Sequence, residues 1–106
     1  IDLSFFLSTT LSGYDYMTKP VLYDFFATWC GPCRMQTPII EELGKKLGDA
    51  VEIQKVDVDE HMDLAEKYAI RVVPTLIIEK DGKVVQRMEG VTDAATLENL
   101  LRPLVG

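Results

Sequence analysis

The residues best suited to chemistry in this sequence are its two cysteines, Cys30 and Cys33. They follow a strongly apolar segment and begin a stretch with helical spacing, so we expect them at the N-terminus of a helix. Positions i and i+3 of a helix are neighbours, so a short disulfide can close there. The free N–H groups and the positive dipole end at such a terminus stabilise a thiolate, the nucleophilic form of cysteine. Because so small a loop adds little entropic stability, the spacing indicates chemistry rather than a structural staple.

The two cysteines are expected to have different roles. Cys30 lies at the exposed edge and is predicted to attack, whereas Cys33 lies one turn further in and is predicted to resolve a mixed disulfide. Gly31 allows close approach to the backbone, and Pro32 stiffens the turn. Half of a zinc site is one alternative, but zinc needs four ligands and His61 is the one histidine, so we expect no metal and no cofactor. Two inert thiols are the other alternative.

Asp24 is the next informative residue, because it interrupts an otherwise apolar segment just before the cysteines. Burial of an unpaired carboxylate costs free energy and raises its pKa, which suits a group that exchanges protons with Cys33. An edge-strand aspartate that faces solvent is the alternative. Lys55 follows Val51 and Ile53 at alternate positions of a later strand. Its ammonium group either reaches Asp24 as a counter-charge or extends to water, and the sequence leaves both open.

Three further side chains have predicted positions in the fold. Trp29, next to the nucleophile, is predicted to shape a docking surface rather than to fill the core. Met35 falls on the apolar stripe of the helix and is expected to pack in the core. Asp59 is expected to cap a short helix that reaches Tyr68.

The elements that must position these residues alternate along the chain. Strands are predicted at 21–27, 51–58, 75–78 and 84–88, and helices at 32–47, 59–68 and from about 92 to 104. Asp81-Gly82 indicates a hairpin turn, Pro38 a kink in the first helix, and Thr92 or Asp93 the cap of the last. Alternating apolar residues at 3–7 suggest one further strand in front. This order predicts a mixed sheet with helices on both faces.

Length and charge restrict the possible partners. The chain has 106 residues, enough for one domain over 1–106, and a net charge of −6 without any basic tract. Such a surface repels nucleic acid and anionic membranes, so neither is expected as a partner. No apolar run approaches the roughly 20 residues of a membrane helix. Residues 3–11 have no preceding basic residue and no small-residue cleavage site, so we do not expect an intact signal peptide there.

Taken together, these residues resemble the thioredoxin family from Val21 onward. The segment 24–33, which ends in Trp-Cys-Gly-Pro-Cys, is similar to the family's active-site segment and is its most specific motif. Lys55 resembles the family's lysine near a buried aspartate. Val73-Pro74-Thr75 is similar to its cis-proline loop, and Gly90 to a glycine beside its docking groove.

The resemblance implies a three-layer α/β/α sandwich with a mixed central sheet and a cis Val73–Pro74 bond. It also implies a monomeric, cytoplasmic enzyme that reduces disulfides in target proteins and receives electrons from a thioredoxin reductase-like donor. Two residues depart from the family pattern. Phe26 stands where many members have a second tryptophan, and Glu89 places a charge in a usually apolar groove.

Two other functions compete with that of a reductase. A disulfide oxidase or isomerase uses the same dithiol chemistry, although those relatives usually carry a histidine between the cysteines, where this chain has Gly31-Pro32. A binding module that uses the groove without turnover is the third possibility.

Overall fold

The computed structural model describes residues 19–105. Along the chain it forms β1 (Val21–Phe26), α3 (Gly31–Leu47), β2 (Glu52–Asp57), α4 (Met62–Lys67), β3 (Thr75–Lys80), β4 (Lys83–Glu89) and α5 (Ala94–Leu101). Short 3₁₀ turns follow α3 and α5. This order confirms the predicted β-α-β-α-β-β-α sequence. The additional strand expected at 3–7 lies outside the described residues.

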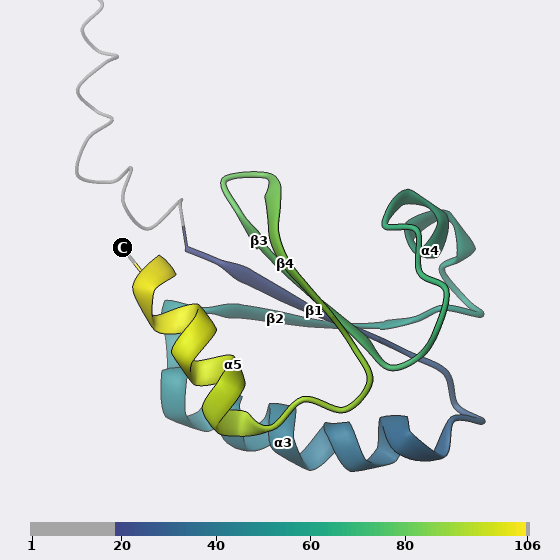
Figure 1. Ribbon diagram of the computed structural model, residues 1–106, viewed down its shortest axis with the longest axis horizontal. Helices are drawn as coiled ribbons and strands as arrows, with labels where there is room; N and C mark the ends of the chain where they lie inside the picture. The colour runs from purple at the N-terminus through teal and green to yellow at the C-terminus, as the bar shows by residue number, and fades with distance from the viewer. Residues whose placement is uncertain (1–18, 106) are drawn as a thin grey trace, which may run out of the picture.

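The described strands form a mixed sheet in the order β2-β1-β3-β4. β1 pairs with β2 in parallel and with β3 antiparallel, and β3 and β4 form an antiparallel hairpin. The hairpin turns at Asp81 and Gly82, whose φ angles of +55° and +79° fit the predicted Asp-Gly turn. β1 therefore lies inside the sheet, with a strand on each side (Figure 1).

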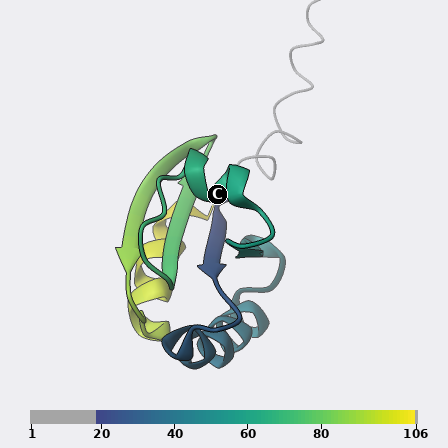
Figure 2. The ribbon, with the colours of Figure 1, turned by 90° about the vertical axis from the view of Figure 1, so that its right-hand side faces the viewer.

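Helices cover both faces of this sheet, which confirms the predicted three-layer arrangement. α3 and α5 lie on one face and α4 on the other (Figures 1 and 2). Side chains alternate along β1, so Leu22 packs into the core under α3 and α5, whereas Phe25 packs with Tyr68 on the α4 side. Asp24 shares the parity of Leu22 and therefore points toward α3. None of the described helices is long and apolar enough to cross a bilayer.

The helix that follows the cysteines begins at Gly31, runs through Pro38 and ends before Gly48, whose φ is +54°. The expectation that Met35 packs in the core is wrong, because its side chain is 63% exposed. Gln36 is buried instead. Its amide accepts a bond from the Thr92 N–H at 2.8 Å and donates one to the Thr92 carbonyl at 2.9 Å. The apolar stripe misled the prediction because a buried polar side chain continues the core face at this end of the helix.

The other two helices test the predicted caps. The Asp93 side chain accepts a hydrogen bond from the Thr96 N–H at 2.8 Å, so the cap of α5 is confirmed. The predicted cap of α4 is wrong. That helix begins at Met62 without a side-chain cap, and the Asp59 carboxylate binds Trp29 instead.

Candidate active site

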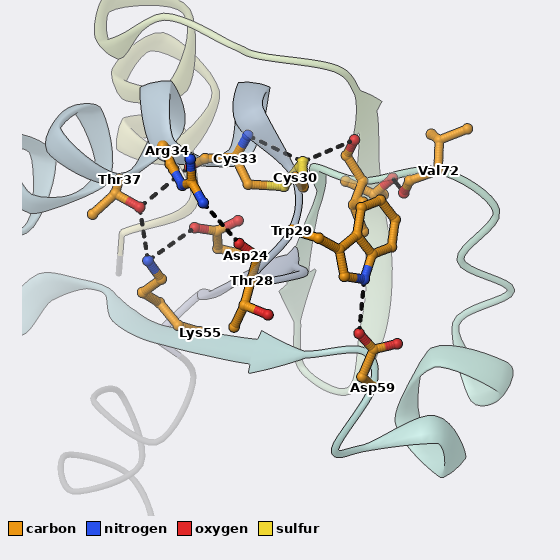
Figure 3. The surroundings of a disulfide bond; sticks show 12 residues. Asp24, Thr28, Trp29, Cys30, Cys33, Arg34, Thr37, Lys55, Asp59 and Val72 are labelled. Carbon is orange, nitrogen blue, oxygen red and sulfur yellow. Dashed lines mark hydrogen bonds and ion pairs between the residues drawn. A yellow bond between two sulfur atoms is a disulfide. The ribbon is translucent and has the colours of Figure 1, made fainter.

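The two cysteines form a disulfide at the junction of β1 and α3 (Figure 3). Cys30 is the N-cap residue of α3, and its sulfur accepts a hydrogen bond from the Cys33 N–H at 3.2 Å. The expectation that Cys30 is the more exposed cysteine is wrong, because each residue is 4% exposed. What distinguishes them is the backbone N–H directed at Cys30 Sγ. Such a bond favours the thiolate of Cys30 once the disulfide is reduced.

A loop distant in sequence borders the disulfide. The Val73–Pro74 peptide bond is cis, as the resemblance implied. Cys30 Sγ lies 3.6 Å from the Val73 carbonyl oxygen. The Gly90 N–H donates to the Pro74 carbonyl at 2.8 Å, and Gly90 has a φ of +97° that favours glycine. Val73 therefore lies beside Cys30, and the other two predicted residues, Pro74 and Gly90, are hydrogen-bonded to each other next to it.

Trp29 lies on the surface next to this loop. Its side chain is 69% exposed, so it is not part of the core, and its indole N–H donates to the Asp59 carboxylate at 2.9 Å. A groove of about 290 Å³ extends from it, and its lining residues are Trp29, Val58, Ala65, Ile70, Arg71, Val72 and Val73. Apart from its neighbours in the chain and the backbone of its own helix, no described atom lies within 4 Å of where a Gly31 Cβ would be, so the surface at Gly31, between the two cysteines in sequence, is open.

Asp24 is buried within the sheet, with 1% of its surface exposed, which rules out the solvent-facing alternative. Neither of its carboxylate oxygens has a hydrogen-bond partner among the described residues. The Lys55 ammonium group is 4.0 Å from Oδ2. Burial raises the pKa of Asp24 to about 6, and the positive charge of Lys55 opposes this rise. The carboxyl group therefore titrates close to neutral pH.

Lys55 does both things that the sequence left open. It stands opposite Asp24 in the β1–β2 register, yet its side chain is partly exposed. Its ammonium group also donates to the Thr37 hydroxyl at 2.9 Å and lies 4.8 Å from the centre of the Phe26 ring. Phe26, one of the two departures from the family pattern, therefore packs against this cation.

Thr37 is a site residue that the sequence prediction missed. Its hydroxyl donates to the Cys33 carbonyl at 3.2 Å and accepts from Lys55. A threonine four residues after a cysteine on a helix was the available signal. Thr37, Lys55 and Cys33 line a second hollow beside the disulfide. Lys55, the ion-pair partner of Asp24, therefore lines the same hollow as Cys33.

The arrangement suits thiol chemistry. Among residues 19–105, no three His, Cys, Asp or Glu side chains gather as a metal centre would require. A sulfur at a helix N-terminus, a second sulfur within bonding distance and a titratable carboxyl group are the components of dithiol–disulfide exchange.

Comparisons with known proteins agree with this chemistry. The family model described as Thioredoxin matches residues 12–103. A thioredoxin-like protein of Synechocystis sp. is 47% identical over 87 residues, which cover 82% of this chain and 83% of that protein. The thioredoxin of Bacillus subtilis is 46% identical over 81 residues, which cover 76% of this chain and 78% of the other. The structure of a mutant thioredoxin from Halobacterium salinarum, 37% identical, matches with a TM-score of 0.77 and covers 93% of this chain and 86% of its own.

These matches extend over most of the chain, and the match to the family model, at residues 12–103, includes the strand, the helix and both cysteines of the site. The chain therefore has the thioredoxin fold and belongs to the thioredoxin family, and it is a protein thiol–disulfide oxidoreductase whose redox-active disulfide joins Cys30 to Cys33.

Proposed function

We propose that this protein works as a general dithiol reductase, with Cys30 as the attacking thiolate and Cys33 as the resolving thiol. The observation that carries this assignment is the hydrogen bond from the Cys33 N–H to Cys30 Sγ at the start of α3. It directs a backbone dipole at one sulfur and leaves the other without this stabilisation.

Reduction of a target proceeds in two exchanges. The Cys30 thiolate attacks one sulfur of the target disulfide, a mixed disulfide forms, and the other target sulfur leaves as a thiolate that takes up a proton. Cys33 then loses its proton and attacks Cys30 Sγ. The second target sulfur leaves as a thiolate and takes up a proton, and the Cys30–Cys33 disulfide remains. The target gains two electrons and two protons; this protein supplies both electrons, Cys33 releases one proton in the second exchange, and the other was released when the Cys30 thiolate formed.

Asp24 is proposed to accept the proton of Cys33 in the second exchange. Its position toward α3, its lack of a hydrogen-bond partner in the described part of the chain and a pKa near 6 support this role. Lys55 stabilises the ionised form of the carboxyl group, and through Thr37 it is also connected to the Cys33 carbonyl. A carboxylate without hydrogen bonds is the more basic acceptor, and among residues 19–105 the charge that stabilises its ionised form is that of Lys55.

Target proteins are proposed to dock on the groove that Trp29, Val72 and Val73 line. The Val73 backbone, next to Cys30 Sγ, is suited to pair with an extended target segment. Gly31 and Pro32, between the two cysteines, are exposed and are proposed to contact the target, as are Pro74 and Gly90, which are hydrogen-bonded to each other beside Val73. Exposed apolar side chains around a reactive pair are typical of a site that binds varied protein segments.

A thioredoxin reductase-like enzyme is proposed as the electron donor, since the oxidised pair must regain two electrons after each target. We also propose that the protein is a monomer and works in a reducing compartment such as the cytoplasm, where a dithiol reductase can be maintained in its reduced form. A rice relative that is 44% identical is described as chloroplastic. Protease protection of the native full-length protein in fractionated cells distinguishes these compartments.

Alkylation and turnover test the assignment. Brief treatment of the reduced protein with iodoacetamide, followed by peptide mapping, is expected to label Cys30 before Cys33. Turnover of an insulin-like disulfide substrate distinguishes an enzyme from a binding module. Preferential labelling of Cys33 would reverse the two roles, and absence of turnover would remove the reductase function.

The reduction potential separates a reductase from an oxidase. Since Gly31-Pro32 is the pair typical of reducing members, we expect a potential of about −250 mV or lower. A reduction potential of about −120 mV, which is typical of strong thiol oxidants, would favour the oxidase function instead.

A further inference from the structure

A pair of opposite charges borders the groove beside the disulfide. The Arg71 guanidinium lies 3.2 Å from the Glu89 carboxylate, and the Arg71 side chain is 76% exposed. Arg71 precedes the cis-proline loop, and Glu89 immediately precedes Gly90, whose N–H is bonded to the Pro74 carbonyl. Glu89 also stands opposite Thr75 in the β3–β4 register. Arg71 therefore belongs to the segment that contacts Cys30 through Val73, and Glu89 to the segment that is hydrogen-bonded to Pro74 in that loop.

Arg71 connects two hollows of the surface. Arg71 is the one charged residue among the described residues that line the groove beside Trp29. It also lines a neighbouring hollow of about 270 Å³, together with Ala69, Arg87 and Glu89. The Arg87 guanidinium donates to the Tyr68 carbonyl, which fixes a second positive charge there. Two guanidinium groups against one carboxylate make this hollow positive, in a chain whose net charge is −6.

The ion pair leaves much of the binding capacity of Arg71 unused. A guanidinium has five N–H donors, and in this pair Nη2 alone contacts the carboxylate oxygens, at 3.2 and 3.4 Å. Exposed ion pairs are weak and screened by salt. A carboxylate of the target can therefore bind Arg71 beside Glu89 or in its place with little loss of free energy. Arginine also binds carboxylates through two parallel hydrogen bonds, which selects for an acidic side chain.

The position of Arg71 fixes where such a side chain would lie. Cys30 Sγ is next to the Val73 carbonyl, and Arg71 is two residues earlier in the chain. Two residues of backbone span at most about 7 Å, and the bends at 72–74 shorten that reach. A target segment that pairs with Val73 would therefore bring side chains two or three residues from its reactive cysteine to Arg71.

We propose that Arg71 is a specificity-determining residue that favours target disulfides with acidic residues within about three positions of the reactive cysteine, and that Glu89 moderates this preference by competing for the same guanidinium. The proposal rests on the reductase function proposed above and names its preferred class of target.

Three disulfide peptides test the proposal. They are identical except at the positions two and three residues before and after the reactive cysteine, which hold glutamate in the first peptide, glutamine in the second and lysine in the third. The measured quantity is the ratio of kcat/KM for the glutamate peptide to that for the lysine peptide. We expect this ratio to exceed one at low ionic strength and to fall about threefold in Arg71→Gln, which is the size of effect that exposed charge pairs have. Glu89→Gln is expected to raise it, and Arg71→Lys to retain most of it.

Matched controls come from the ion pair of Arg102 and Glu98 at the end of α5, which lies far from the β1–α3 junction (Figure 1). Arg102→Gln and Glu98→Gln make the same changes in net charge and are expected to leave the ratio unchanged. Circular dichroism verifies that each variant is folded. A ratio that is the same in Arg71→Gln as in the parent protein would overturn the proposal, even if all peptides are reduced. Failure of the parent protein to reduce the glutamine peptide would instead overturn the reductase function on which it rests.

Discussion

Two carboxylates on paired strands of the sheet, Asp24 on β1 and Glu79 on β3, have opposite surroundings. Glu79 accepts hydrogen bonds from the Tyr68 hydroxyl at 2.6 Å and from the Tyr23 hydroxyl at 3.5 Å, in the aromatic cluster beneath α4. Burial, and then the bond to Glu79, raises the pKa of Tyr68. Asp24, on the α3 face, has no hydrogen-bond partner among the described residues and one ammonium group at 4.0 Å.

In the proposed mechanism, Glu79 is a structural carboxylate and Asp24 is the functional one. A hydrogen-bonded carboxylate contributes to stability, and its hydrogen bonds stabilise the ionised form, which makes it a weaker proton acceptor. A buried carboxylate without such bonds destabilises the fold when ionised, and it is retained where a proton must be moved. The account therefore predicts that changes at the two sites have opposite effects on stability and unequal effects on exchange.

The largest effect is expected for Cys33→Ser, which removes the thiol whose proton Asp24 is proposed to accept. Turnover should fall by at least about 100-fold, and a mixed disulfide between Cys30 and the target should accumulate because nothing resolves it. Non-reducing gels of the protein with a disulfide substrate measure this product. Adding Asp24→Asn in this background should leave the rate of trapping unchanged. Slower trapping would mean that Asp24 acts on Cys30 rather than on Cys33.

Asp24→Asn alone is expected to stabilise the protein and to slow exchange. Ionising Asp24 in the folded state, with a pKa near 6 against 3.8 for the ordinary group, destabilises the fold by about 3 kcal/mol. Exchange should slow by about 100-fold, since the proton acceptor for Cys33 is lost. Chemical denaturation and single-turnover kinetics on the same sample measure both. A destabilised variant with full activity would show that Asp24 is a structural residue.

The stability gained by Asp24→Asn depends on pH, and the sign of this dependence follows from the raised pKa of Asp24. Below about pH 4 the carboxyl group is protonated in both the folded and the unfolded state, so it contributes no difference. Between about pH 4 and 6 the folded state binds more protons than the unfolded state, so the parent protein loses stability as the pH rises. The advantage of Asp24→Asn should therefore grow through this window and remain constant above it.

Glu79→Gln is the matched change on the other face and should have the opposite effect on stability. It replaces a charged acceptor of the Tyr68 hydroxyl with a neutral one, so the free energy of unfolding should fall by about 1.5 kcal/mol. Resolution by Cys33 should keep its rate, because Glu79 lies on the α4 side of the sheet. An exchange defect equal to that of Asp24→Asn would remove the distinction between the two carboxylates.

The smallest effect is expected for Lys55→Met. This change removes the positive charge that lowers the pKa of Asp24, so that pKa should rise above about 6. The fall in stability with rising pH should then extend to higher pH. Because Lys55 is partly exposed and screened by solvent, the loss of stability at pH 7.5 should stay below about 1 kcal/mol. Denaturation curves across pH 4–9 measure the shift, and a lower midpoint would contradict the assigned sign.

Much of the site could be predicted from local sequence. An apolar strand, a cysteine pair and a helical stripe place Cys30 and Cys33 at a strand–helix junction, and the one carboxylate within that strand identifies Asp24. These features depend on residues close together in the chain, where spacing determines geometry.

What the sequence did not predict depends on contacts between distant segments. The bond between Trp29 and Asp59, the bonds of Gln36 to Thr92 and the pairing of Arg71 with Glu89 each join segments that only the folded sheet brings together. A polar residue such as Gln36 is predicted to face solvent unless its buried partner is known. Equal burial of the two cysteines was missed for the same reason, since the loop at Val73 covers Cys30.

The most direct test of the central claim is a carbon-13 NMR titration of the Asp24 carboxyl group in the oxidised and in the reduced protein. The account predicts a midpoint near pH 6 in the oxidised protein and a different midpoint after reduction, because the free Cys33 thiol then exchanges protons with this group. An ordinary midpoint near pH 4 in both states would contradict it.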